Sequence, residues 1–209
     1  MNQEQIKIRL NNFIVILIIF MITSCVTDKR IFQKKRFAEF GQLKIQTAIK
    51  LERRAWAKDI SPDHLIEIGE GLYPNPNKFI LVTPKIYKLK ERPNFEKEVD
   101  YFYTSNDNSV KAILYDWNKS RRTKHRIFIS ESNTPEIFKA FQVKFDWLKE
   151  RLSNELGDPI EINITQSPNL IESYKDYIKW KGKTGLNAFL ILFGNKYGYR
   201  EIRLVIYKD

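Results

Sequence analysis

The sequence predicts an α+β fold in which an antiparallel sheet is backed by a long helix. Residues 135–156 repeat apolar side chains every three or four positions, which is typical of an amphipathic helix. Residues 98–103 and 110–117 are alternating, β-prone runs that flank a turn-forming segment. Residues 186–193 and 199–207 form a second pair of this kind. Strands joined by short turns pair antiparallel, so both pairs predict the same type of sheet.

Two helices are expected before the sheet. The first covers residues 43–57, with apolar side chains, including Trp56, at helical spacing and with Arg53 and Arg54 turned to water. The second begins at Ser61-Pro62-Asp63, because a hydroxyl cap, a proline at the first position and an acid near the positive end of the helix dipole favour a helix start. It is expected to end near Gly69, where a run of glycine, proline and asparagine predicts an irregular loop.

The strands follow in order. Residues 79–83 and 86–89 are short β-prone runs separated by Pro84. The segment between residues 98–103 and 110–117 is turn-forming throughout, which predicts a hairpin. Apolar side chains lie on both faces of its second strand, so both faces need cover. A further short strand is expected at residues 126–130.

The C-terminal part is expected to complete the sheet. The predicted helix starts after Thr134 with Pro135 at its first position. Residues 160–164 alternate isoleucine with polar side chains, which predicts a half-buried strand. Residues 171–178 have the spacing of one or two helical turns. In the last strand, the apolar side chains at 202, 204 and 206 share one face, so we expect a helix to cover that face.

The N-terminus carries the features of an export signal. Lys7 and Arg9 precede ten consecutive residues, 13–22, drawn only from Phe, Ile, Val, Leu and Met. A positive segment followed by a short apolar one is typical of a signal peptide, and a membrane-spanning helix needs roughly 20 apolar residues. The run ends at Ile22-Thr23-Ser24-Cys25, and Cys25 is the single cysteine of the chain.

These four residues resemble the lipobox of bacterial lipoproteins, in which small or aliphatic residues precede an obligatory cysteine. The resemblance implies cleavage between Ser24 and Cys25, diacylglycerol linked to the Cys25 sulfur, and acylation of the new amino group. Ile22 stands where the pattern most often has leucine. An ordinary secretory peptide and an uncleaved signal anchor are the alternatives. Two or three acyl chains hold a protein durably on a membrane, whereas one chain does not.

The predicted organisation has three parts: a signal peptide at residues 1–24, a lipidated cysteine with a basic tether at 25–36, and a single α+β domain at 37–209. A chain that begins at Cys25 loses two of the 36 basic residues and one of the 25 acidic residues, and its net charge is +10. With its one cysteine lipidated, the domain has no disulfide and no thiolate metal site. We therefore expect no cofactor and no metal beyond the covalent lipid.

The densest basic patch predicts contact with an anionic partner. It consists of Lys119, Arg121, Arg122, Lys124 and Arg126. Export removes the chain from most nucleic acid, so the expected partners are the membrane, another envelope protein or an anionic envelope polymer. Surface aromatics near Leu72-Tyr73-Pro74 are a second candidate contact.

Candidate catalytic residues are few. His64 and His125 are the only histidines and show no metal-ligand spacing, and no nucleophile, phosphate-binding or dinucleotide-binding motif is present. The oxygen-rich turn at residues 106–108 lacks the downstream glutamate of a calcium loop. Four carboxylates could supply a catalytic pair in space: Glu67, Glu70, Asp100 and Asp116.

The sequence therefore predicts a bacterial envelope lipoprotein that is not an enzyme and acts as a binding or interaction module. A structural envelope component and, less favoured, a hydrolase with a carboxylate pair are the alternatives. Val26 is not the aspartate that follows the cysteine in some lipoproteins retained at the inner membrane, so the outer membrane is favoured if the source has two membranes.

Overall fold

The structure is a computed structural model that describes residues 30–74, 78–91, 94–119, 135–164, 173–195 and 199–208. It divides into two units, Met1–Glu39 and Phe40–Asp209. In the first unit, the amides of Arg36 and Phe37 donate to the carbonyl of Gln33, so the described residues form turns. No helix in these described ranges is both long and apolar enough to cross a membrane.

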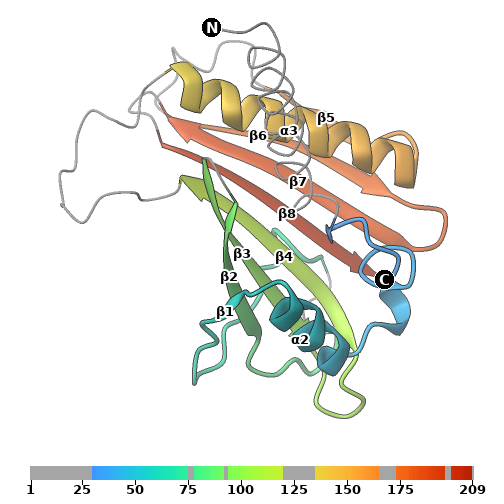
Figure 1. Cartoon of the computed structure of the whole chain (residues 1–209). Coiled ribbons are helices and arrows are strands. Elements are labelled where there is room, and N and C mark those ends of the chain that lie inside the picture. The colour runs from blue at the N-terminus through green and yellow to red at the C-terminus, as the bar shows by residue number, and fades with distance from the viewer. Residues whose placement is uncertain are drawn as a thin grey trace, which may run out of the picture. The chain divides into compact units, whose positions relative to one another are not determined.

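One antiparallel sheet of eight strands dominates the second unit (Figure 1). The strand order is β1-β2-β3-β4-β8-β7-β6-β5, so β4 and β8 join an N-terminal half to a C-terminal half. The strands are β1 (Lys58–Asp59), β2 (Lys85–Glu91), β3 (Phe95–Tyr103), β4 (Val110–Lys119), β5 (Glu161–Asn163), β6 (Ser173–Lys181), β7 (Leu186–Asn195) and β8 (Arg200–Lys208). Both predicted hairpins, β3–β4 and β7–β8, are confirmed.

The register places apolar side chains on both faces of the sheet. Tyr115 pairs with Leu204, which pairs with Leu190, so these three side chains share one face, called the helix face below. All three are fully buried. The opposite face holds a second core, to which the irregular segment between β1 and β2, described at residues 60–74 and 78–83, contributes. The buried members of this core are Ile68, Tyr73, Phe102, Ala112, Leu114, Phe189, Ile191 and Val205. Both faces are therefore covered, as the two-sided pattern of β4 predicts.

Helix α3 (Pro135–Leu156) covers the C-terminal half of the sheet on the helix face. It packs against β6, β7 and β8, and Figure 1 shows it running along these strands. Its bounds match the predicted 135–156, and the described members of the apolar stripe that are buried are Phe141, Phe145, Leu148 and Leu152. At 22 residues it is nevertheless a small part of a fold that is mostly sheet. The α+β prediction therefore holds only in its coarse form, an antiparallel sheet with helices.

Helix α2 (Ile45–Arg54) confirms the first N-terminal helix but is shorter than predicted. The amide of Trp56 donates to the carbonyl of Arg53, and the amide of Ala57 donates to that of Glu52, which closes the helix in a Schellman turn. Trp56 occupies the left-handed position of this turn (φ 58°), where glycine is usual. Its side chain is 94% exposed, so the prediction that it lies on the buried stripe is wrong.

The second N-terminal helix is also wrong, because residues 61–69 are not helical. The hydroxyl of Ser61 donates to Oδ1 of Asp59 over 2.6 Å and accepts the amide of Ile86 over 3.0 Å. The Ser61 hydroxyl, which was expected to cap a helix, therefore hydrogen-bonds an extended segment to β2. In the loop that follows, Tyr73 is 1% exposed, so the expected surface aromatic is a core residue.

Two predictions near the C-terminus also fail. Residues 171–178 were expected to be helical, but the described part belongs to strand β6, where Tyr174, Ile178 and Trp180 are buried. The four-residue step from Tyr174 to Ile178 fits both a helix and a strand. The two-residue step from Ile178 to Trp180 fits only a strand. The strand at 160–164 exists as β5, but it is exposed rather than half-buried. It lies at the sheet edge beyond the strands that α3 contacts. The strand expected at 126–130 lies outside the described residues.

A buried ionic cluster joins α3 to the N-terminal half of the sheet. Glu91 contacts Lys144 of α3 through one carboxylate oxygen and Lys97 through the other, the latter at 3.3 Å. The indole N–H of Trp117 also donates to Glu91, over 3.1 Å. All three charged side chains are almost fully buried. Burying charges costs free energy unless they are paired, so the stability of this cluster depends on the contacts of Glu91 with both lysines.

Candidate functional site

The predicted lipidation site lies outside the described residues. Cys25 and Ser24 precede residue 30, and of the predicted basic patch only Lys119 is described, as the last residue of β4. Arg121, Arg122, Lys124 and Arg126 follow outside the described ranges, as does His125. The described part of the basic patch is therefore its first residue, at the end of β4.

A row of charged residues crosses the sheet on the face opposite the helices. Lys88 pairs with Glu98, Glu98 with Asp116, and Asp116 with Arg203, at one register level across β2, β3, β4 and β8. Lys88 Nζ lies 3.1 Å from Glu98 Oε1. Asp116, one of the candidate carboxylates, is a member of this row. Asp100, a second candidate, lies on the same face of β3, two residues beyond Glu98.

Arg203 is the hub of the charged row. Its Nε donates to Asp116 Oδ1 over 2.7 Å and its guanidinium NH₂ donates to Asp116 Oδ2 over 3.2 Å, which is the bidentate geometry of strong ion pairs. The same NH₂ donates to Glu201 Oε1 over 2.9 Å, and the Tyr199 hydroxyl donates to the other Glu201 oxygen. Asp116 thus accepts two hydrogen bonds from Arg203, whereas no hydrogen bond to Asp100 exists among the described residues.

The two aspartates have unusual protonation behaviour. Burial, followed by repulsion from Asp116 and Glu98, raises the pKa of Asp100 from 3.8 to about 7. Burial also raises the pKa of Asp116, although the hydrogen bonds from Arg203 oppose this. Near neutral pH, Asp100 is thus partly protonated, whereas Asp116 is paired with Arg203.

The other candidate catalytic residues do not join this pair. Glu67 and Glu70 lie exposed in the irregular segment. His64 is exposed beside them, with Nδ1 3.1 Å from Asp63 Oδ1. Of the four candidate carboxylates, Asp100 and Asp116 lie on the same face of neighbouring strands, whereas Glu67 and Glu70 belong to a different part of the fold. Within the described residues, no group of three or more His, Cys, Asp or Glu side chains is arranged to hold a metal ion.

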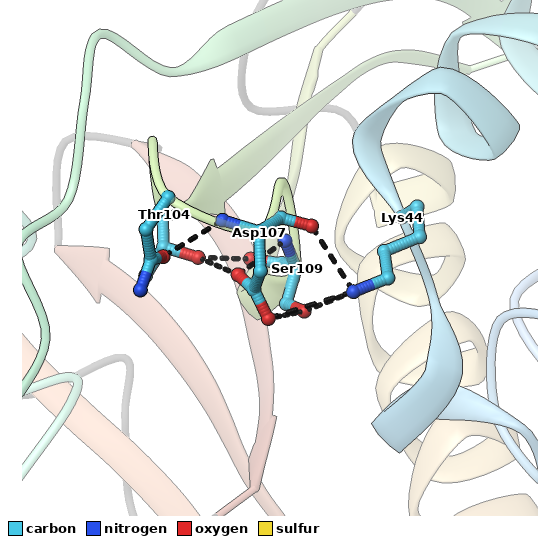
Figure 2. A network of polar contacts seen from close by, with 5 residues as sticks. Lys44, Thr104, Asp107 and Ser109 are labelled. Carbon is cyan, nitrogen blue, oxygen red and sulfur yellow. Dashed lines mark hydrogen bonds and ion pairs between the residues drawn. The ribbon is translucent and has the colours of Figure 1, made fainter.

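The oxygen-rich turn between β3 and β4 is satisfied internally (Figure 2). Asp107 accepts hydrogen bonds from the hydroxyls of Ser109 and Thr104, and Lys44 Nζ lies 3.5 Å from its Oδ2. The hydrogen bonds from Ser109, then those from Thr104, lower the pKa of Asp107. This turn carries a structural network that also contacts the residue preceding α2, and its oxygens are already engaged.

A basic and aromatic surface on the same face as the charged row was not predicted. We call it the Lys175 surface; it consists of Lys175, Tyr177, Lys179, Phe193 and Arg203, above the buried ring of Phe189. Lys175 Nζ lies 5.9, 5.6 and 6.0 Å from the ring centres of Tyr177, Phe189 and Phe193. Lys179 Nζ lies 5.2 Å from the rings of Tyr177 and Phe189. These are cation–π distances.

The missed signal is the alternation of lysine and aromatic residues from Lys175 to Lys179. In a helix, Lys175, Tyr177 and Lys179 would point in different directions, whereas in a strand they lie on one face. Phe189 and Phe193 then join them from β7, because Phe193 pairs with Lys175 and Phe189 with Lys179. Only the register of β6 against β7 builds this surface.

Comparison with known proteins gives no further guide to the site. No family model matches the chain, and neither a curated protein nor a solved structure shows a significant match to it.

Proposed function

We propose that this protein is a bacterial envelope lipoprotein, anchored through Cys25, whose sheet domain is a non-catalytic binding module for an anionic envelope polymer or protein. The anchor rests on the Ile22-Thr23-Ser24-Cys25 resemblance. The observation that carries the binding role is the Lys175 surface, where cationic side chains stand over aromatic rings on one sheet face.

Lys175 is the member of this surface that is available to an external anion. Lys179 Nζ contacts Glu161 at 2.7 Å and Arg203 is engaged by Asp116, whereas Lys175 is exposed and has no carboxylate partner among the described residues. A cation that already lies near aromatic rings offers an anionic ligand both charge and apolar contact area.

The last residue of β4, Lys119, lies near the register level of Lys175 in the sheet. Asn118 pairs with Glu201, Glu201 with Phe193, and Phe193 with Lys175. Lys119, the next residue of β4, therefore ends its strand one register step beyond the level of Lys175. The basic residues 121–126 follow Lys119 in the sequence.

The anchor is tested by Cys25→Ser. The variant is expected to remain as an unprocessed precursor and to incorporate no labelled palmitate, while the parent chain incorporates it. Unchanged labelling, mobility and membrane fractionation in the variant would overturn the lipoprotein assignment.

The binding role is tested with the full chain in detergent, using dextran sulfate as the anionic probe and neutral dextran as its uncharged counterpart. Lys175→Glu, and separately the pair Arg121→Glu and Arg122→Glu, are expected to weaken dextran sulfate binding about tenfold, equivalent to about 1.4 kcal/mol. Lys139→Glu is the matched control, because Lys139 is an exposed lysine on α3, which covers the opposite face. Binding should also weaken with added salt.

If the parent chain shows no preference for dextran sulfate over neutral dextran, the polymer-binding role fails and the structural-component alternative is favoured. If it binds, but Lys139→Glu weakens binding as much as Lys175→Glu does, the interaction follows net charge and the Lys175 surface is not the site.

A hydrolase that uses Asp100 and Asp116 is the second candidate. The raised pKa of Asp100, about 7, is the supporting observation, because a general acid must hold a proton near neutral pH. Release of reducing ends from purified envelope glycan, lost in both Asp100→Asn and Asp116→Asn, would support this candidate. Activity that survives both changes would remove it.

A further inference from the structure

Strand β5 lies at an edge of the sheet, and one isoleucine within it and one at each of its ends are exposed. Among the strands of the described residues, β6 is its only neighbour. Ile160, Ile162 and Ile164 are 66%, 55% and 44% exposed. Because they alternate along an extended segment, all three side chains point to the same face. That face is the helix face, since Ile162 pairs with Ile178, which is fully buried there.

An edge strand with an apolar stripe is a ready template for pairing with another strand, and proteins usually protect such edges with charge or keep them very short. Both edge strands are short, since β1 consists of Lys58 and Asp59 and β5 of Glu161–Asn163, but exposed isoleucines lie on and beside β5 and not β1. The single charge within β5 is Glu161. Its carboxylate already accepts a hydrogen bond from the Tyr177 hydroxyl over 2.6 Å and contacts Lys179 Nζ at 2.7 Å. The hydrogen bonds from Lys179, then Tyr177, lower the pKa of Glu161.

We propose that β5 pairs antiparallel with β5 of a second copy of this chain, around a two-fold axis at Ile162. The sequence Ile160-Glu161-Ile162-Asn163-Ile164 is self-complementary in this register. Ile162 then lies opposite its own counterpart, and Ile160 lies opposite Ile164 of the second copy. Six isoleucines meet on one face, and cross-strand apolar pairs are the unit of sheet stabilisation.

Charge is also compatible with this register. Glu161 of each copy lies opposite Asn163 of the other, so no like charges face each other across the junction. Because Lys179 of its own chain contacts Glu161, pairing does not require a new counter-ion. A shift of the register by two residues would leave isoleucines unpaired at both ends, which favours the centred arrangement.

The helices do not obstruct this pairing. Helix α3 packs against β6, β7 and β8, so it is centred near β7, two strands inward from the edge. Five strand spacings of about 4.8 Å separate β7 of one copy from β7 of the other, which places the two α3 helices about 24 Å apart. Packed helices lie about 8–10 Å apart, so room remains between them for the isoleucine stripe.

The first test is disulfide trapping in the full chain in detergent. Cys25→Ser removes the single native cysteine, so any introduced cysteine is unique. Directly opposed residues in an antiparallel pair have Cα atoms about 4.5–5.5 Å apart, within the range of disulfides. Ile162→Cys is expected to form a covalent dimer by itself. A mixture of Ile160→Cys and Ile164→Cys chains is expected to cross-link, whereas Ile160→Cys alone is not.

Ile80→Cys is the matched control, because Ile80 is an exposed isoleucine (84%) outside β5. Cross-linking of Ile80→Cys as extensive as that of Ile162→Cys would mean random collision and would overturn the proposal. Cross-linking of Ile160→Cys with itself would place the axis elsewhere and would overturn the register. If Ile162→Cys does not cross-link at protein concentrations up to about 1 mM, self-pairing is overturned. The partner of the β5 edge is then an extended segment of another protein.

The second test measures mass in solution without cross-linking. By sedimentation equilibrium, the parent chain is expected to show a concentration-dependent dimer, and Ile162→Lys is expected to be monomeric at the same concentrations. Val143→Lys, at an exposed apolar residue of α3, is expected to leave the dimer unchanged. Unaltered circular dichroism shows that the variants fold. A dimer that persists in Ile162→Lys, or a parent chain that stays monomeric, contradicts the proposal.

Discussion

The phenolic oxygen of Tyr101 donates a hydrogen bond of 2.6 Å to Oε1 of Glu52, and this contact fastens α2 to β3. Both side chains are almost fully buried, Glu52 at 1% and Tyr101 at 0% exposure. Glu52 is therefore an acidic side chain on the inward stripe of an amphipathic helix. A buried carboxylate at such a position requires partners, and the sheet supplies one.

Tyr101→Phe tests the contribution of this contact. Removing the hydroxyl takes a hydrogen-bond donor from a buried carboxylate, so we expect the free energy of unfolding to fall by about 1–3 kcal/mol. Urea unfolding followed by circular dichroism measures the change. Tyr103→Phe is the control, because Tyr103 lies nearby on β3 and no hydrogen bond of its hydroxyl is found among the described residues. Equal losses in both variants would show that the Glu52 contact is not the cause.

Asp100→Asn tests the raised pKa of Asp100. The folded state holds this proton up to about pH 7, whereas the unfolded state releases it near 3.8. The stability contributed by the protonated group is therefore complete below about pH 4 and is lost as the pH rises through 7. Asparagine does not titrate, so the stability of the variant relative to the parent chain should rise by about 4 kcal/mol between pH 4 and pH 8.

Urea unfolding at pH 4, 6 and 8 measures this difference between Asp100→Asn and the parent chain. Asp158→Asn serves as the control, because Asp158 is exposed on the turn after α3. A difference that is constant across this pH range would mean that Asp100 ionises at its ordinary pKa in the folded protein.

Gly194→Ala tests the packing of Tyr174 on the backbone of β7. Tyr174 pairs directly with Gly194 across β6 and β7, and a Cβ at Gly194 would overlap the Tyr174 ring. An aromatic ring that covers a glycine in the facing strand stabilises the sheet. We expect Gly194→Ala to lower the free energy of unfolding by about 1–3 kcal/mol. The second change Tyr174→Leu should make the alanine less costly, and Gly69→Ala, where the added methyl meets no atom, should have a small effect.

Glu91→Gln tests the buried ionic cluster. The change removes the negative charge that Lys97 and Lys144 both contact, so two buried ammonium groups lose a counter-ion. Breaking a buried pair on one side typically costs about 3–5 kcal/mol. Replacing Glu91 by leucine together with Lys97 and Lys144 by methionine should cost less, because no buried charge remains. Glu155→Gln, which removes an exposed i,i+4 pair with Arg151, should leave urea unfolding unchanged.

Sequence reasoning succeeded where one local period was unambiguous. The stripe from Phe141 to Leu152 fits only a helix, and the C-terminal alternation from Ile202 to Ile206 fits only a strand. It failed where short spacings were ambiguous, as at Tyr174 and Ile178. It also failed at Ser61, where the capping hydroxyl found partners in β1 and at the start of β2 rather than in a helix.

For the candidate sites, the sequence identified Asp100 and Asp116 as carboxylates that could meet but gave no reason to prefer them over Glu67 and Glu70. The choice depends on which residues face each other across β3 and β4. The Lys175 surface depends in the same way on the pairing of β6 with β7. Its lysine and aromatic residues come from two strands, and no local pattern relates them.

By itself, the sequence determined the position of α3, both hairpins and the two-sided character of β4, because each follows from the period of apolar residues along one segment. The prediction of a lipid anchor at Cys25 also comes from the sequence alone. Tertiary structure decided which charges face one another, which carboxyl group holds its proton and which edge exposes isoleucine. These properties depend on strand order and register, which are set by contacts between residues far apart in the chain.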